Sequence, residues 1–462
     1  MDADGLKQEI DRKIYEVKRL ITNIEELLEE KKYEKYIPKE VKEFVLYIKE
    51  YVNISNEHFN FTRQISQETF SIPVLTALLS LLDTFKEGFF SLHHFFKEII
   101  EISILESPSP LLIYFNKILR KIYRDGKIIA TKQSEYNFHF IPLYKISGRP
   151  LLDPNRKLEH FALIRYPFSE YKNVFSNILL IHELGHFIYK KLNIKNKIIS
   201  SIDPQEFDQY EQAINEYVET NYQSDYIIET PPKMWETIFS WWEESFADFF
   251  AVRIIGPAFL YAFIKFNLIL KDTEIKIFIS QHPSRYYRIT RIIGLLIKDG
   301  WESVIKLKTP RIYKWADDID AFKNLSYNIP TSIFSFDEDP IRECYKYLEK
   351  TIEKVALVTE ELTANCNYDL ETFEEENDIV EECLKKFIPP SEIFYKDNFF
   401  IAKPESILNT AFIFYLNDGI EQWYSMSDRS KDDKTDHFFD NRLNEFVLKS
   451  IEDNLILEIW GK

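Results

Sequence analysis

Apolar residues recur at helical spacing along most of the chain. In the first segment they follow alternating steps of four and three, which places one apolar seam on a helix: Ile10, Ile14, Val17, Ile21, Ile24 and Leu28. Such a seam serves either a coiled-coil dimer or an intramolecular helix bundle, and its short length favours the bundle. Pro38 then precedes a second predicted helix over residues 39–51, since proline is tolerated in a first turn.

The pattern changes after Gly126. Residues 127–147 hold β-branched and aromatic side chains at mixed spacing, and residues 160–166 predict a short strand. A long helix is expected next, over about residues 169–192. A loop-rich stretch is expected from there to about residue 232.

A further helix is predicted over residues 235–255, and it ends at the helix-breaking pair Gly256-Pro257. Helical patterns return beyond it and continue to the C-terminus. The chain is therefore expected to comprise three regions, which are an N-terminal helical bundle or coiled-coil region, a core, and a mostly helical C-terminal region: residues 1–125, 126–300 and 301–462.

The two most apolar stretches are residues 71–82 and 254–264. Each is shorter than the roughly 20 residues that a helix needs to span a bilayer. Both are therefore expected to be buried core segments, and no membrane span is expected.

The amino-acid composition limits which fold class and which partners are expected. With only 10 glycines and many Leu, Ile, Lys and Glu residues, the chain is expected to be mainly helical. A formal net charge of -17 repels phosphate backbones, so nucleic acid is not an expected partner. The three cysteines form no CxxC pair, so a cysteine metal site is not expected, and their odd, small number indicates reduced thiols. The charged N-terminus lacks an apolar leader, so a cytoplasmic location is expected.

The stretch ILLIHELGHFIY, residues 178–189, carries a candidate metal site. His182 and His186 are four residues apart, so both imidazoles point the same way from a helix and can bind one zinc ion. Glu183 can take a proton from a water whose pKa the metal lowers. The alternative is a helix that carries two histidines by chance. The apolar residues 178–181 argue against it, because burying these polar groups without a metal is costly.

The stretch WWEESFADFFA, residues 241–251, can supply the third protein ligand that a catalytic zinc needs. Glu244 is the best candidate, because Asp248 follows one turn later and can orient a ligand histidine. Glu243 is the competing ligand, but it points about 100° away on the helix. A solvated acidic edge is the alternative, and the aromatic residues around the acids argue against it.

The two stretches resemble the gluzincin pattern, HExxH followed by ExxAD on a downstream helix. His282-Pro283-Ser284 with Arg288-Ile289 is similar to the HP[SP]xxxRI signature of the CaaX-prenyl-protease and HtpX-like metallopeptidases. The resemblance covers roughly residues 159–300. It implies a mainly α (α+β) fold, with a zincin-like metallopeptidase core, a small mixed sheet and helical flanks.

The resemblance also implies the roles of individual residues. Zinc would be bound by His182, His186 and Glu244, and Glu183 would be the general base. Asp248 would support a ligand histidine.

The third motif is expected to complete the site. His282 would donate to the oxyanion of the reaction, and Arg288 would hold the segment or contact the substrate. Helix capping is the alternative role for His282, since Pro283 suits a first turn. Tyr286 and Tyr287 are the alternative oxyanion donors.

The expected function is zinc-dependent hydrolysis of peptide bonds in a protein substrate, by an endopeptidase rather than an exopeptidase, in regulatory proteolysis. The strand over residues 160–166 is expected to pair with an extended substrate as an edge strand. Members of the resembled families span membranes and this chain lacks such spans, so lipid-modified substrates are not expected. The helical flanks are expected to bind a regulatory partner or to self-associate. The alternatives are an inactive zinc-binding scaffold or interaction protein, and a metal-free helical protein.

Overall fold

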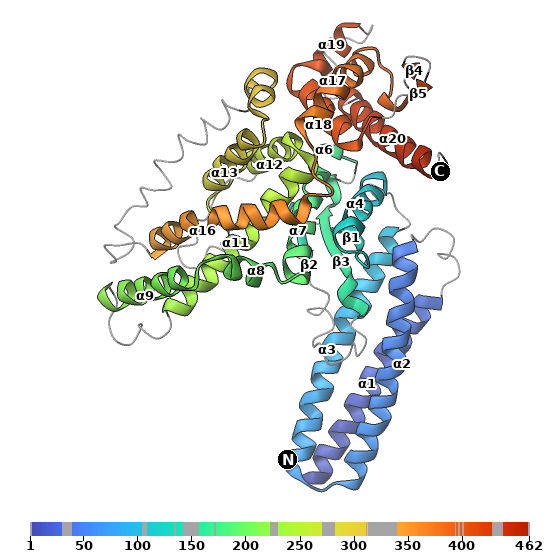
Figure 1. The fold of residues 1–462 in the computed structure, drawn as a ribbon. Helices are drawn as coiled ribbons and strands as arrows, with labels where there is room; N and C mark the ends of the chain where they lie inside the picture. The colour runs from blue at the N-terminus through green and yellow to red at the C-terminus, as the bar shows by residue number, and fades with distance from the viewer. Residues whose placement is uncertain are drawn as a thin grey trace. The chain divides into compact units, whose positions relative to one another are not determined.

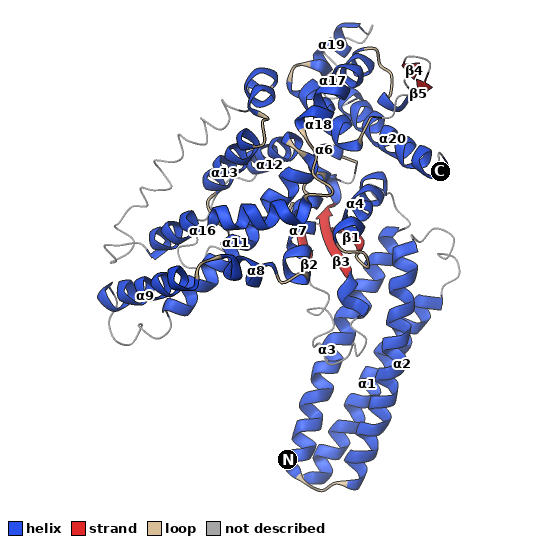
Figure 2. Cartoon of the chain, viewed as in Figure 1, coloured by secondary structure: helices blue, strands red, loops and turns tan. Residues whose placement is uncertain are grey.

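The structure is a computed structural model. It describes residues 2–29, 39–103, 109–133, 135–141, 157–170, 172–221, 230–269, 282–310, 312, 340–392, 394–395, 398–399, 402–426 and 438–460. Figures 1 and 2 show a mainly helical chain with one small mixed three-stranded sheet, so the predicted mainly α fold with a small mixed sheet is confirmed.

The chain divides into two compact units. Unit 1 comprises Met1–Leu112 and Tyr123–Tyr171, and unit 2 comprises Ile113–Ile122 and Lys172–Lys462. The predicted boundary at residue 126 falls within unit 1. The three predicted regions stay a prediction.

Unit 1 contains a bundle of three helices, α1 (Ala3–Glu29), α2 (Lys39–Glu68) and α3 (Ile72–Ser103). The first five residues of the predicted seam, Ile10 to Ile24, are between 0% and 4% exposed. They form one buried cluster with apolar residues of α2 and α3, among them Phe44 and Leu82. The seam therefore serves an intramolecular bundle, as its length indicated.

The expected burial of residues 71–82 is wrong. Only Leu75 and Leu82 of this stretch are buried, whereas Ile72 and Val74 are 49% and 41% exposed. The neighbouring bundle helices cover only one side of α3, so the apolar residues on its other side remain exposed. The second apolar stretch, residues 254–264, is buried along its whole length. Among the described residues, none of the helices has both the length and the apolar composition that crossing a membrane requires.

The sheet of unit 1 has the strand order β1-β3-β2. β1 (Lys127–Gln133) runs parallel to β3 (Phe161–Pro167), and β2 (His139–Ile141) runs antiparallel to β3. The predicted strand is therefore present, but its expected position at an edge is wrong. Arg165 lies opposite Thr131 on one side and His139 on the other. Because both sides of β3 are occupied over residues 163–165, an extended substrate cannot pair with it there.

Unit 2 is built from helices of 4 to 26 residues. Their bounds are α6 (Val174–Asn177), α7 (Leu180–Lys191), α8 (Ile194–Ser201), α9 (Pro204–Asn221), α11 (Thr230–Ile255), α12 (Pro257–Ile269), α13 (Arg285–Lys298), α16 (Pro340–Thr363), α17 (Leu370–Lys385), α18 (Pro404–Leu416), α19 (Gly419–Met426) and α20 (Phe438–Trp460). The shorter elements of the chain are η3 (Lys157–His160), η4 (Phe168–Glu170), η5 (Val304–Lys308), η7 (Pro390–Glu392), β4 (Phe394–Tyr395) and β5 (Asn398–Phe399). A further helix, α4 (Ser109–Ile122), contributes its residues from Ile113 onward to this unit.

Two predictions for unit 2 need correction. The expected helix over residues 169–192 is interrupted, because the side chain of Asn173 caps the short helix α6 and α7 starts anew at Leu180. The expected loop over residues 193–232 contains α8 and α9. The helical signal missed in α9 is the buried series Tyr210, Ile214 and Val218 at steps of four.

Helix α11 is the central element of unit 2 and packs against α7, α12, α13 and α16. The predicted helix over residues 235–255 lies within it, and Gly256 ends it with a φ of 78°. Trp241 and Trp242 are fully buried, and the indole of Trp242 donates a hydrogen bond of 2.8 Å to Thr351 on α16. These contacts fix the packing of α11 against α16.

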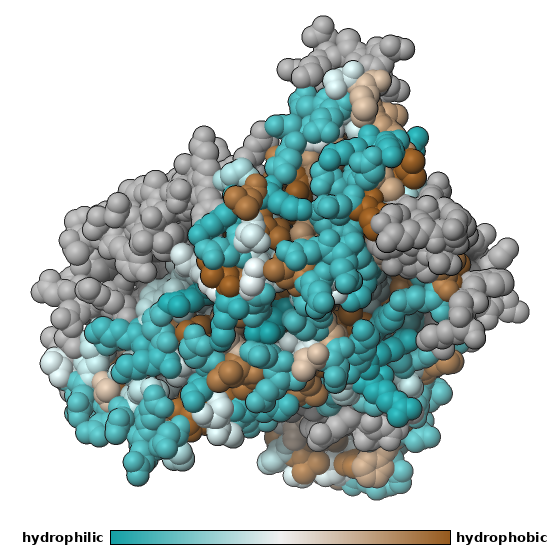
Figure 3. Space-filling model, turned by 45° about the horizontal axis from the view of Figure 1, so that its top comes forward, coloured by the Kyte–Doolittle hydropathy of each residue, from teal (hydrophilic) through white to brown (hydrophobic). Residues whose placement is uncertain are grey.

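On the face drawn in Figure 3, hydrophilic residues predominate, and hydrophobic residues form only small separate patches. This face agrees with the high content of charged residues, 29% of the chain. It offers no broad apolar surface among the described residues.

Candidate metal centre

The close approach of α7 to α11 brings the two sequence stretches together. Gly185 faces Ala247 so tightly that a Cβ atom added to Gly185 would lie 2.7 Å from the Cα atom of Ala247. A side chain at residue 185 would therefore meet the backbone of α11. The glycine of HELGH and the alanine of ESFAD thus set the spacing at which His182 and His186 face Glu244.

Replacing Gly185 with alanine is expected to destabilise the protein by about 1–3 kcal/mol, because the added methyl group has to push two packed helices apart. The same displacement would change the distances between His182, His186 and Glu244, so affinity for added zinc is expected to fall although none of these side chains is altered. Urea unfolding and zinc titration of the full chain measure both effects.

Gly294→Ala provides the matched control, because nothing lies within 4 Å of a Cβ atom at residue 294 on α13. Alanine there is expected to stabilise the protein by about 0.5–1 kcal/mol, since it is the better helix former. Equal effects of the two variants would show that the contact between residues 185 and 247 does not set the helix spacing.

The donor atoms of three side chains converge at the site. His182 Nε2 and His186 Nε2 are 3.1 Å apart. Glu244 Oε2 lies 3.5 Å from His182 Nε2, and Glu244 Oε1 lies 3.4 Å from His186 Nε2. Tetrahedral zinc with bonds of about 2.0–2.1 Å separates its ligand atoms by roughly 3.3–3.4 Å. The two imidazole nitrogens and the Glu244 carboxylate therefore form a triangle in which each imidazole meets a different carboxylate oxygen, and its three separations are close to those between ligands of one zinc ion.

Glu183 lies beside this triangle. The ligand atoms of His182, Glu183 and His186 all lie within 4.8 Å of one another, and the three residues are buried or nearly so. The Glu244 oxygens, at 3.4 and 3.5 Å from the two imidazoles, are close enough to share a small ion with them. Glu244 is therefore suited to be the third ligand, with Glu183 beside it as the candidate base.

The electrostatics of the site fit a cation. Glu244 Oε2 is buried and accepts no hydrogen bond. Burial alone would raise the pKa of Glu244, but the charges of His186, Arg288 and His282 outweigh it and hold that pKa well below its usual range. Burial would lower the pKa of His182, yet Asp248 and Glu244 raise it to about 10. The same carboxylates would stabilise a metal ion, and a donor set of two imidazoles and one carboxylate fits zinc.

Asp248 and Arg288 contact the side chains of the site, Asp248 at His182 and Arg288 at Glu244. Asp248 Oδ1 lies 3.0 Å from His182 Nδ1, which is close enough for this carboxylate to orient the imidazole, although the pair is not aligned as a hydrogen bond. Arg288 donates two hydrogen bonds of 2.7 Å to Asp248. Arg288 Nη1 also lies 3.2 Å from Glu244 Oε2. Of its two predicted roles, buried Arg288 therefore occupies the position suited to holding α13 against α11.

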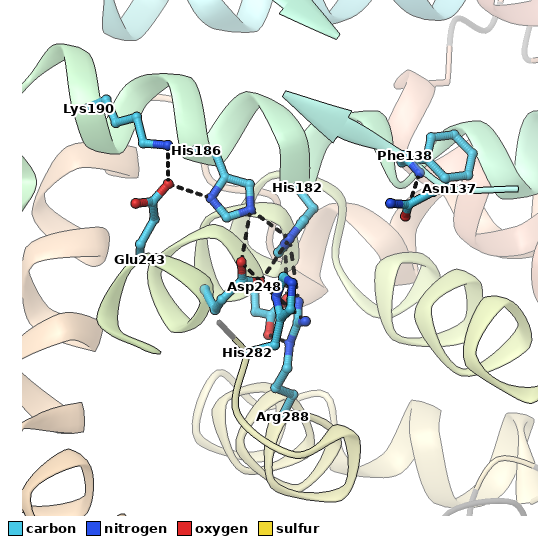
Figure 4. Close-up of polar contacts among 10 residues, drawn as sticks. Asn137, Phe138, His182, His186, Lys190, Glu243, Asp248, His282 and Arg288 are labelled. Atoms are coloured by element: carbon cyan, nitrogen blue, oxygen red, sulfur yellow. Dashed lines mark hydrogen bonds and ion pairs between the residues drawn. The ribbon is translucent and has the colours of Figure 1, made fainter. Parts of the chain in front are cut away.

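Glu243 does not lie with the three converging donors, where a ligand would have to be. Its Oε1 atom lies 2.9 Å from His186 Nδ1, the ring nitrogen opposite the converging donors, and 2.9 Å from Lys190 Nζ. In Figure 4 Glu243 and Lys190 lie on the side of His186 that faces away from His182. The sequence contained one indication of this arrangement. Lys190 follows His186 by one helical turn, so both side chains lie on the same side of α7 and can meet one carboxylate.

His282 lies at the exposed rim of the site. Its side chain is 58% exposed, and its Nδ1 atom is 2.9 Å from Glu244 Oε1. The capping alternative for His282 is wrong, because the Ser284 side chain caps α13 by accepting a hydrogen bond from Tyr287 N. The Tyr287 side chain is buried against Tyr345, and the side chain of Tyr286 lies outside the described residues.

Comparisons with known proteins add no relative. No family model, no curated protein and no solved structure matches the chain. The chemistry of the site is therefore inferred from its own geometry.

Proposed function

We propose that the chain is a zinc-dependent metallopeptidase that hydrolyses peptide bonds of a protein substrate. One observation carries the proposal: two imidazole nitrogens and one carboxylate lie 3.1–3.5 Å apart, with a second carboxylate beside them. A structural zinc site needs four protein ligands and no base, whereas a hydrolytic site needs three ligands, an open position and a base. The arrangement of His182, His186, Glu244 and Glu183 corresponds to the hydrolytic type.

His182, His186 and Glu244 would hold the zinc ion. When bound, the ion supplies a Lewis acid that polarises the scissile carbonyl and lowers the pKa of a water. The protein must then move protons and keep the ligands in place.

Glu183 is the residue suited to move the proton. It adjoins His182 on α7 and is only 7% exposed, so bulk water does not compete strongly for its carboxylate. It takes a proton from the attacking water and passes it to the leaving amine. His282 projects from the rim, where an imidazole N–H can donate to the carbonyl oxygen as charge develops there.

An assay of the purified chain tests this proposal. Cleavage of an unstructured protein such as casein is expected in the presence of zinc, and a chelator is expected to abolish it. Internal cleavage sites would support endopeptidase action. A protein that binds zinc stoichiometrically and cleaves no substrate would contradict the proposal.

A second candidate function is that of an inactive zinc-binding scaffold. It is favoured by the position of His282, because a donor 2.9 Å from Glu244 Oε1 could become a fourth ligand and close the coordination shell. In the proposed peptidase this histidine instead contacts the substrate and is not a ligand.

The His282→Ala variant distinguishes the two functions. For the peptidase we expect an unchanged zinc affinity and a fall in turnover of about 10²–10³-fold, as found when one oxyanion donor is removed. Zinc titration and peptide kinetics measure the two quantities. A large loss of zinc affinity would instead identify His282 as a ligand and favour the scaffold.

A further inference from the structure

Both histidines of the donor triangle have a carboxylate close to their other ring nitrogen. Asp248 lies 3.0 Å from His182 Nδ1, and Glu243 lies 2.9 Å from His186 Nδ1. The two carboxylates are five residues apart on α11, which separates them by roughly 140° around the helix axis. Glu244 lies between them in the sequence. One helix therefore places a ligand in the middle and a supporting carboxylate on either side.

Glu243 contacts two side chains, Lys190 and His186, and the contact with His186 is the one that affects the metal site. Glu243 has a side-chain exposure of 20%, and Lys190 one of 43%, so solvent screens the ion pair between them and this pair alone contributes little to stability. The same Glu243 Oε1 atom, however, also lies 2.9 Å from His186 Nδ1 in hydrogen-bonding geometry. A proton held on Nδ1 by this carboxylate leaves the lone pair of Nε2 free, and Nε2 is the atom that faces His182 and Glu244.

Lys190 completes this arrangement. It lies one turn beyond His186 on α7, and its Nζ atom is 2.9 Å from the oxygen that meets His186. The ammonium group therefore keeps Glu243 extended from α11 toward α7. It also disfavours rotation of Glu243 into the donor triangle, where it would compete with Glu244.

We propose that Glu243, anchored by Lys190, is a positioning residue that fixes the ring orientation and tautomer of His186 for zinc binding. The inference rests on the proposed function in one respect, namely that His186 is a zinc ligand. Carboxylates in this position typically change metal affinity by about 10–100-fold when they are removed. Glu243 thereby acts through His186 and does not touch the substrate.

Zinc titration of the full-length chain against a chromophoric chelator tests the proposal. Glu243→Ala is expected to weaken zinc binding by about 10–100-fold. Glu243→Gln keeps an oxygen that accepts from His186 Nδ1, so it is expected to restore part of the affinity. Lys190→Ala is expected to have a smaller effect than Glu243→Ala. Glu236→Ala is the matched control, because Glu236 is an exposed glutamate on the same helix.

Each outcome bears on the proposal. Wild-type affinity in Glu243→Ala would overturn it while leaving the peptidase proposal intact. A loss of zinc affinity in Glu243→Ala would also overturn it if the metal-free variant unfolds at a clearly lower temperature than the metal-free wild type, because Glu243 would then have a structural role. A wild-type chain that binds zinc but cleaves no substrate would instead contradict the peptidase, and a weaker zinc affinity of Glu243→Ala would still support the role of Glu243. A wild-type chain that binds no zinc would overturn both.

Discussion

Glu183→Gln is expected to retain bound zinc and to lower peptide turnover by about 10²–10⁴-fold. Glutamine has the same shape as glutamate, but its amide cannot take a proton from water. The three donors that lie 3.1–3.5 Å apart do not include Glu183, so the metal site stays complete in this variant. Metal analysis by mass spectrometry and single-turnover peptide kinetics measure the two properties on the same preparation.

The exposed Glu236 on α11 again supplies a control, since Glu236→Gln makes the same chemical change away from the site. Turnover equal to wild type in Glu183→Gln would exclude Glu183 as the base. Loss of zinc in that variant would lead to a different correction. It would identify Glu183 as a ligand, which its distance of at most 4.8 Å from the histidine donors allows.

Glu244→Ala is expected to reduce zinc affinity by more than the roughly 10–100-fold typical of a supporting residue, because it removes a ligand itself. It also removes the carboxylate that lies between both imidazoles and 3.2 Å from Arg288 Nη1. Buried Arg288 keeps its two hydrogen bonds to Asp248, so the variant is expected to remain folded. Zinc titration, together with thermal unfolding of the metal-free protein, separates loss of the ligand from loss of the fold.

Full zinc occupancy in Glu244→Ala would show that another carboxylate completes the site. Glu183 would then be the candidate, because its ligand atom already lies within 4.8 Å of both histidine donors. Glu243 would not be, because it meets His186 on the opposite ring nitrogen. A double variant at residues 183 and 244 would then be needed to release the metal.

Local spacing was sufficient to predict several features of the protein. The step of four between His182 and His186 places both imidazoles on one side of α7 whatever surrounds that helix. The same periodicity predicted the buried seam of α1 and the extent of α11 to within a few residues at its start. These features depend on the geometry of a single helix, and a helix repeats that geometry without reference to distant residues.

Features that depend on two distant segments required the tertiary structure. The sequence allowed Glu243 and Glu244 as rival ligands, and only the placement of α7 against α11 put Glu244 at the imidazole Nε2 atoms and Glu243 at His186 Nδ1. Strand β3 was recognised, but not its central position, because strand order depends on which other segments pair with it. The exposed face of α3 likewise depends on how much of that helix its neighbours cover.

The sequence by itself thus determined which residues could bind a metal and on which helix faces they lie. The tertiary structure alone decided their distances, through the contact between Gly185 and Ala247 that lets two helices approach closely. The physical reason is that helical periodicity is a property of neighbouring residues, whereas coordination distances and hydrogen-bond partners depend on side-chain packing between segments more than 50 residues apart.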